Sequence, residues 1–202
     1  MSVKGYKFLE RYVDNDYETV TLYFKAPKNT FKEMSKSKLS IEFPDDELDI
    51  SEVSVQVGPM LDDGTVTGWY DVKLTYEQIE ELVDLALKTE KEQWVKKIIS
   101  KIKKSGWSVY KEDDDYYSFG KYTPAGQDFN FTVNIGDSLQ DFADNVYDYY
   151  EGFDVSFEAY LWLDCNGHGK NGAPYEMIDV YKDMQNCEQF IYDLYELIKK
   201  EI

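Results

Sequence analysis

The sequence predicts an α+β fold in two units, each a small antiparallel sheet followed by helices, with a long helix at the C-terminal end. Three observations indicate this class. Segments rich in β-branched and aromatic residues precede segments with helical spacing, and this order occurs twice along the chain. A lysine-rich helix end, closed by Ser105-Gly106, separates the two runs. The last apolar run keeps a 3-4 spacing without a break. We therefore expect domains at residues 1–104 and 105–202.

Strands open the first unit. The expected strands cover residues 6–13, 17–25, 54–57 and 66–74. Asp14-Asn15-Asp16 lies between the first two and predicts a hairpin turn. The polar, lysine-rich stretch 27–38 predicts a long loop. Thr75 and Gln78 form a capping box, which predicts the start of a helix. A second helix is expected over 90–104.

The second unit repeats the order of strands and then helices. Its expected strands cover residues 107–110, 116–122 and 129–135. Apolar residues from Leu139 to Tyr149 fall at helical spacing and predict a helix. Residues 153–163 fit either a strand or a short helix. The run from Met177 to Ile198 predicts one long helix, either buried against the sheet of its own unit, which we prefer, or paired in a coiled coil.

Composition excludes several classes of protein. The chain has 202 residues and a net charge of −18, so it is not a basic nucleic-acid-binding domain, and no direct binding to nucleic acid is expected. Hydrophobic residues make up 43% of the chain, which is enough for a core. No apolar run approaches the ~20 residues that span a membrane, and the first residues show no apolar signal segment. With only Cys165 and Cys187 present, we expect a cytoplasmic protein without a disulfide framework.

Motifs for catalysis and cofactor binding are missing. The chain has a single histidine, His168, and it contains no phosphate-binding loop, dinucleotide fingerprint or serine elbow. We therefore expect no enzyme, no cofactor and no histidine- or cysteine-based metal site. A calcium or magnesium site and a glycosidase carboxylate pair remain open, because carboxylates are abundant. An enzyme that uses the glycine-rich loop around His168 is a third possibility.

The charge is uneven along the sequence. Residues 1–104 carry a net charge of −4 and residues 105–202 a net charge of −14. From Asp137 to Glu151, acidic residues recur at spacings of 4, 3, 4 and 3, which places a row of carboxylates on one side of the helix expected there. Such a row can stand in for phosphates in a groove lined by Lys and Arg. A solvated face that serves only solubility is the alternative. The candidate phosphate surrogates are Asp113, Asp114, Asp115, Asp137, Asp141, Asp144, Asp148 and Glu151.

Tyrosine and tryptophan are dense in the same half. Aromatic side chains beside acids give protein interfaces a large contact area at low entropic cost. They can also build the core, and both roles are open here. The aromatic candidates are Tyr116, Tyr117, Tyr122, Tyr147, Tyr149, Tyr150, Tyr160 and Trp162.

Two segments carry a resemblance to known proteins. They are Tyr122-Thr123-Pro124-Ala125-Gly126-Gln127-Asp128-Phe129-Asn130-Phe131 and Gly167-His168-Gly169-Lys170-Asn171-Gly172-Ala173-Pro174. The region they lie in, roughly 105–200, resembles a small acidic domain of bacterial plasmid, conjugative-element and phage proteins, which is similar in context to antirestriction proteins. In overall character the chain is similar to the DNA-mimic class of anti-CRISPR and anti-restriction inhibitors. Residues 1–104 share no such likeness.

The resemblance and the acidic row lead to one leading hypothesis. They imply a non-enzymatic inhibitor that binds a basic nucleic-acid-processing protein, such as a CRISPR nuclease of the Cas9 type or a restriction enzyme, and blocks its nucleic-acid channel. The first unit would be a scaffold or a second contact surface. The alternative is an acidic protein–protein interaction module of a mobile genetic element that inhibits nothing.

Overall fold

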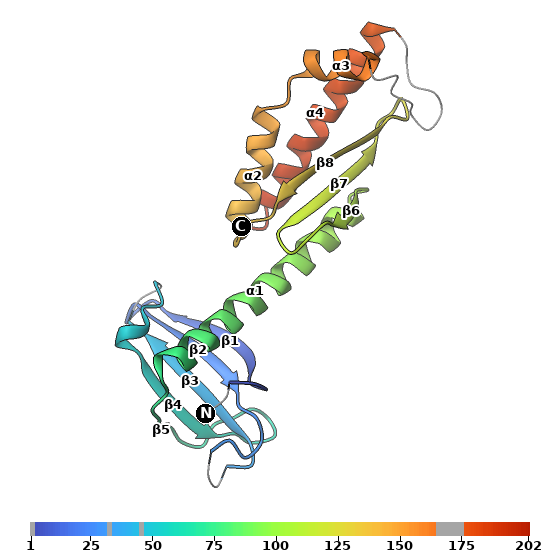
Figure 1. Cartoon of the computed structure of the whole chain (residues 1–202). Helices are drawn as coiled ribbons and strands as arrows, with labels where there is room; N and C mark the ends of the chain where they lie inside the picture. The colour runs from blue at the N-terminus through green and yellow to red at the C-terminus, as the bar shows by residue number, and fades with distance from the viewer. Residues whose placement is uncertain (1–2, 32–33, 45–46, 165–175) are drawn as a thin grey trace. The chain divides into compact units, whose positions relative to one another are not determined.

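The computed structural model describes residues 3–31, 34–44, 47–164 and 176–202. It divides the chain into two compact units, Met1–Glu90 and Lys91–Ile202. Each unit contains an antiparallel sheet, and the described residues form four α-helices, of which the last is long (Figure 1). The predicted α+β class is therefore confirmed.

The first unit is built on a five-stranded sheet with the strand order β1-β2-β3-β4-β5. Its strands are β1 (Lys7–Asp14), β2 (Thr19–Lys25), β3 (Ser37–Phe43), β4 (Ser54–Pro59) and β5 (Tyr70–Asp71), with a short 3-10 helix, η1 (Ile50–Glu52), before β4. The predicted hairpin is confirmed, because the Asp14 carboxylate accepts the backbone N–H groups of Asp16 and Tyr17 and closes the turn.

Two strands of the first unit differ from the sequence prediction. Strand β3 was not predicted: its first two residues fall at the end of the expected loop 27–38, and no element was expected for the rest. Leu39, Ile41 and Phe43 alternate with polar residues and are fully buried. Strand β5 is far shorter than the expected 66–74. The chain there crosses so close over Gly58 that a Cβ on this glycine would collide with Val66 and with a backbone carbonyl. This close approach leaves little room for regular hydrogen bonding between β4 and the segment before β5.

One continuous helix, α1 (Tyr76–Lys104), replaces the two helices that were expected. Its capping box is confirmed: the Gln78 N–H donates to Thr75 Oγ1, and the Thr75 N–H donates to Gln78 Oε1 over 3.0 Å. No glycine or proline interrupts the helix before Gly106, whose φ of +96° suits the chain reversal after the last turn.

The division between the units falls inside α1, between Glu90 and Lys91, not after Lys104. A glycine stop signals where a helix ends, whereas a unit is defined by the core into which its apolar residues are buried. Ile79 and Leu82 belong to the core of the first unit, and Ile98 and Ile102 belong to the core of the second. The predicted boundary after Lys104 therefore coincides with the end of α1 and not with the division between the two units.

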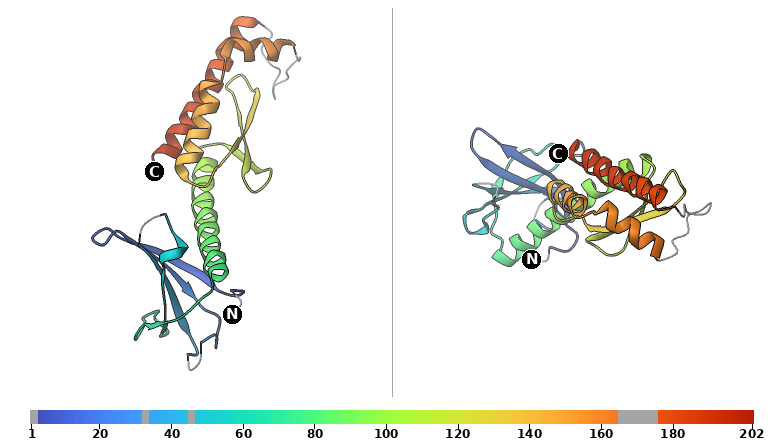
Figure 2. Two further views of the ribbon diagram at one scale, coloured as in Figure 1. Left: turned by 60° about the vertical axis from the view of Figure 1, so that its left-hand side comes forward. Right: turned by 90° about the horizontal axis from the view of Figure 1, so that it is seen from above.

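The second unit has a three-stranded sheet in the order β6-β7-β8. The strands are β6 (Ser108–Lys111), β7 (Tyr116–Tyr122) and β8 (Asp128–Asn134), and the helices that follow are α2 (Leu139–Glu151), α3 (Val155–Asp164) and α4 (Met177–Lys199). Figures 1 and 2 show α2 and α4 running antiparallel, side by side, next to this sheet. The ambiguous segment 153–163 is thus mostly helical, and the Asp154 carboxylate accepts the N–H groups of Ser156 and Phe157 at its start.

From Val180 onward the predicted seam of α4 is buried within its own unit, as preferred over a coiled coil, whereas Met177 at its start is exposed. The seam residues pack with the sheet and α2 around Trp107, Phe119 and Phe131. Cys187 lies in this seam with a fully buried thiol, and burial raises its pKa. The buried seam residues are Val180, Met184, Cys187, Ile191, Leu194 and Ile198. Of the helices described, none has the length and apolarity that a membrane span requires.

Ile102→Ala should destabilise the second unit by about 2–5 kcal/mol, because it opens a cavity in a fully buried site. Hydrogen exchange should show faster exchange in β7 and β8 and unchanged protection in β2 and β3. Leu82→Ala is the matched control, and it should give the opposite pattern. Equal loss of protection in both sheets for either variant would contradict the assignment of α1 to two cores.

Candidate protein-interaction surface

The acidic turn between β6 and β7 is held by interactions within the second unit. Asp113 accepts the backbone N–H groups of Asp115 and Tyr116 at 2.9 and 2.8 Å. Asp114 pairs with Lys111 at 2.7 Å, and Asp115 pairs with Lys91 at 2.8 Å. Asp113 therefore holds the turn in shape, and the charges of Asp114 and Asp115 are each paired with a lysine.

Lys91 of α1 also binds Asp137, the first carboxylate of the predicted row, at 2.9 Å. Burial alone would lower the pKa of Lys91, but the hydrogen bonds and charges of Asp115 and Asp137 outweigh it and raise that pKa. One lysine thus ties α1 to the β6–β7 turn and to the segment before α2. Asp137 is consequently not free to act as an isolated phosphate surrogate.

Asp141 belongs to the N-terminal cap of α2. Its Oδ2 accepts the N–H groups of Asp137 and Ser138, at 3.1 and 3.0 Å, while its own N–H donates to Ser138 Oγ at 3.1 Å. These bonds make a capping box. Hydrogen bonding to Ser138 and Asp137 lowers the pKa of Asp141. This carboxylate stabilises the helix start, although it lies on the predicted side of α2.

Asp144, Asp148 and Glu151 remain as an exposed row on α2. With 3.6 residues per turn, they fall within an arc of about 60° and span about 10 Å along the axis. Among the described residues, no lysine or arginine forms a salt bridge with any of the three. Asp144 accepts a hydrogen bond from the neutral amide of Gln140 at 2.7 Å. Their charge is therefore available to a partner.

Four tyrosines gather beside this row, where α2 meets α4. Tyr147 and Tyr150 come from α2, and Tyr192 and Tyr195 come from α4. Their ring centroids are 4.9 Å apart for Tyr147–Tyr195 and 5.3 Å for Tyr150–Tyr192, and one tyrosine pair within each helix completes the cluster. The sequence analysis singled out the tyrosines of α2 and missed those of α4. The available signal was their i, i+3 spacing beside the buried seam.

Carboxylates and phenols interact within this cluster. The charge of Glu151 and a hydrogen bond with it raise the pKa of Tyr147, and the charge of Glu196 raises that of Tyr192. Lys199 lies 5.2 Å from the Tyr195 ring, at one edge. We call this surface the acidic–tyrosine face; it comprises Asp144, Tyr147, Asp148, Tyr150, Glu151, Tyr192, Tyr195 and Glu196.

The division at Glu90 changes the charge comparison. Residues 1–90 carry 10 basic and 19 acidic residues, and residues 91–202 carry 12 basic and 21 acidic, so each unit has a net charge of −9. Six of the lysines in the second unit lie on α1. The predicted difference in net charge between the two halves is therefore a separation of charge within the second unit. The part of α1 that belongs to this unit is basic, and the acidic–tyrosine face is acidic.

Comparison with known proteins adds no relative. No protein family, curated protein or solved structure matches the chain. The resemblance to mobile-element domains therefore stays a prediction, and its second segment, with His168, lies outside the described residues. Within the described ranges, no group of three or more His, Cys, Asp or Glu side chains is arranged to hold a metal ion.

Asp141→Ala should lower the free energy of unfolding by about 1 kcal/mol at pH 7, because it removes half of the capping box. The folded-state pKa of Asp141 lies below its unfolded value, so its contribution is present above the unfolded pKa and is lost as pH falls through the folded pKa. Urea unfolding from pH 7 to pH 3 should therefore show the difference shrinking. Asp144→Ala, on the same helix without a cap role, should change stability by only a few tenths of a kcal/mol.

Proposed function

We propose that this protein is a non-enzymatic binding protein of the cytoplasm. In this proposal the acidic–tyrosine face occupies the nucleic-acid groove of a basic nucleic-acid-processing protein and inhibits it. A CRISPR nuclease of the Cas9 type is the first target to test, and a restriction enzyme is the second. The observation that carries the proposal is the row of Asp144, Asp148 and Glu151, unpaired with any described cation and lying beside four tyrosines.

The spacing of the row suits a cationic groove. Consecutive carboxylates on one side of a helix lie about 5–6 Å apart, in the range of phosphates along a strand. Like charges at this spacing destabilise a helix by a few tenths of a kcal/mol per pair. A basic partner would relieve that repulsion and would be steered to the face by its charge.

The tyrosines supply contact area next to the charge. Tyr192 is 37% exposed, and the four rings contact one another, so little side-chain entropy is left to lose on binding. Charge alone would give a loose, salt-sensitive association. Packed aromatic rings would add the specificity that a single target requires.

The proposal now rests on three of the eight predicted surrogates. The other five are Asp113, Asp114, Asp115, Asp137 and Asp141, which accept backbone N–H groups or pair with lysine. Because these five carboxylates already have partners within the second unit, the proposed contact narrows to the outer side of α2 and its border with α4.

The alternative function is an interaction module of a mobile genetic element that inhibits nothing. The tyrosine cluster favours this second candidate, because an aromatic interface needs no phosphate mimicry. Salt separates the two: an electrostatic contact weakens steeply as salt rises, whereas an aromatic contact does not.

The triple variant Asp144→Asn, Asp148→Asn, Glu151→Gln should weaken binding to a Cas9–guide RNA complex by about tenfold or more, because it removes the unpaired row. Wild-type affinity should fall by about tenfold between 50 and 300 mM salt, and the variant should show a shallower dependence. Biolayer interferometry measures both, and a DNA-cleavage assay measures inhibition.

The matched control is the triple variant Asp114→Asn, Asp115→Asn, Asp137→Asn. It changes net charge by the same amount but removes carboxylates that already pair with lysine. Its affinity should stay within about twofold of wild type. If both triples weaken binding equally, net charge rather than the row is responsible. If neither Cas9 nor a restriction enzyme binds the wild type, the assignment of targets is wrong.

A further inference from the structure

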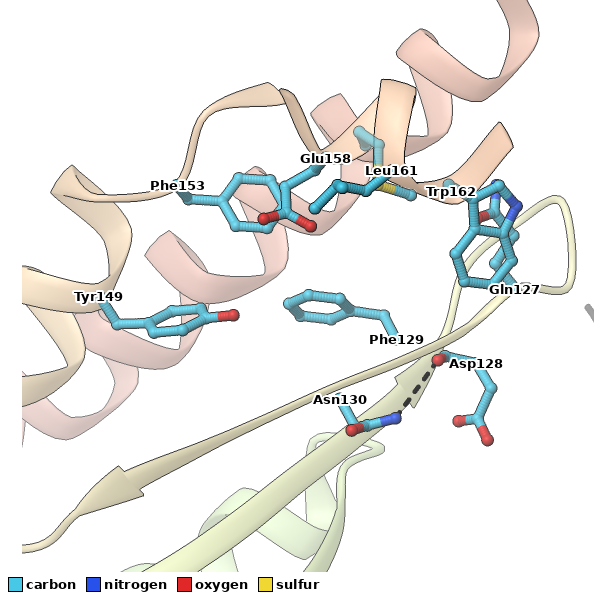
Figure 3. A pocket seen from close by; sticks show the side chains of 10 residues that line it. Gln127, Asp128, Phe129, Asn130, Tyr149, Phe153, Glu158, Leu161 and Trp162 are labelled. Atoms are coloured by element: carbon cyan, nitrogen blue, oxygen red, sulfur yellow. Dashed lines mark hydrogen bonds between the residues drawn. The ribbon is translucent and has the colours of Figure 1, made fainter. Parts of the chain in front are cut away.

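A cavity of about 260 Å³ lies within the second unit, lined by residues of β8, α2, α3 and α4 and by Gln127 before β8 (Figure 3). None of its lining residues belongs to the acidic–tyrosine face. Tyr149, the α2 residue that lines it, stacks on Phe131 of the sheet with ring centroids 4.4 Å apart. The volume is just below the roughly 300–1,000 Å³ of pockets for drug-sized ligands, so an occupant would be small.

One end of the cavity has buried polar atoms that find no hydrogen-bond partner in the part of the chain that the structure describes. Gln127 is fully buried, and neither its side-chain oxygen nor its side-chain nitrogen has a hydrogen-bond partner among the described residues. The indole Nε1 of Trp162 is buried as well, and within the described ranges it also has no hydrogen-bond partner. Figure 3 shows Gln127 and Trp162 toward one end of the cavity and Tyr149 toward the other. Native proteins rarely leave buried donors and acceptors unpaired, so these atoms are candidates to bind a ligand.

The backbone holds Gln127 in place. Its N–H donates to Thr123 Oγ1 over 3.0 Å, and its carbonyl accepts the Thr123 N–H over 2.9 Å. Thr123 Oγ1 in turn donates to Asp183 Oδ2 over 2.6 Å, and Asp183 is only 2% exposed on α4. The unpartnered amide is therefore carried on a turn anchored to the core, which is the preorganisation that a binding site needs.

The walls favour a flat, apolar ring. Phe129 packs edge-on against Phe153, with ring centroids 5.9 Å apart, and both line the cavity with Tyr149. Burial raises the pKa of Tyr149 to about 12, so its hydroxyl stays protonated. Glu158 and Asp128 also line the cavity, and their negative charge opposes an anionic occupant.

We propose that this cavity binds a small, uncharged or weakly basic nitrogen heterocycle with an amino group beside a ring nitrogen, of the kind found in adenine. The amino group would donate to Gln127 Oε1, and the ring nitrogens would accept from Gln127 Nε2 and Trp162 Nε1. A glutamine amide makes this paired contact with adenine in nucleic-acid recognition. The aromatic walls would enclose the faces of the ring. This proposal does not rest on the proposed function.

The test uses the full ¹⁵N-labelled chain titrated with adenosine and followed by NMR. The indole signal of Trp162, identified by its loss in Trp162→Phe, should shift on binding. Purine riboside, which lacks the amino group, and adenosine monophosphate, which adds negative charge, should each bind at least about tenfold more weakly. No shift of the Trp162 signal at millimolar adenosine would overturn the proposal, as would equal binding of purine riboside.

Gln127→Met separates a binding role from a structural one. Methionine has a similar volume without polar atoms, so it should weaken adenosine binding by about tenfold or more, while the melting temperature of the ligand-free protein should rise. A lower melting temperature would show that the amide has a structural partner and would overturn the proposal, as would undiminished binding. Trp69→Phe, in the first unit, is the control for binding and should leave the affinity for adenosine unchanged.

Discussion

Burial of the seam of α4 is the constraint on which the second unit depends. With Val180, Ile191 and Ile198 fully buried, α4 can face the sheet in only one rotation. That rotation brings Tyr192 and Tyr195 to the border with α2, where they meet the tyrosines of that helix. It also places Asp183 against Thr123 and so fixes the turn that carries Gln127. The acidic–tyrosine face and the cavity therefore both depend on the orientation of α4 against the sheet.

Much of the fold follows from local patterns in the sequence. The hairpin at Asp14, the capping box at Thr75, strand β7 and the seam of α4 were predicted because each depends on neighbours in sequence. Strand β3 was missed although its apolar residues alternate, because the lysine-rich stretch that predicted a loop extends over its first two residues. The shortness of β5 was not predictable, since it depends on the close approach of Val66 and Gly68 to Gly58. Local sequence patterns do not show this contact.

The candidate site was less predictable than the fold. Helical spacing correctly placed acidic residues on one side of α2, but spacing does not show which carboxylates already have partners. Lys91 lies far from Asp137 in sequence and neutralises it only in the folded unit, and Asp141 accepts N–H groups that become available only at a helix start. Nothing in the sequence predicted a binding role for Gln127, because the lack of a hydrogen-bond partner for its amide among the described residues depends on how the chain buries it.

The buried thiol in the seam of α4 has a practical consequence. Cys187 is 0% exposed and its raised pKa keeps it protonated, so a thiol reagent can react with it only when the helix layer separates from the sheet. In a chain with Cys165 replaced by serine, the alkylation rate of Cys187 would therefore report how often the core of the second unit opens.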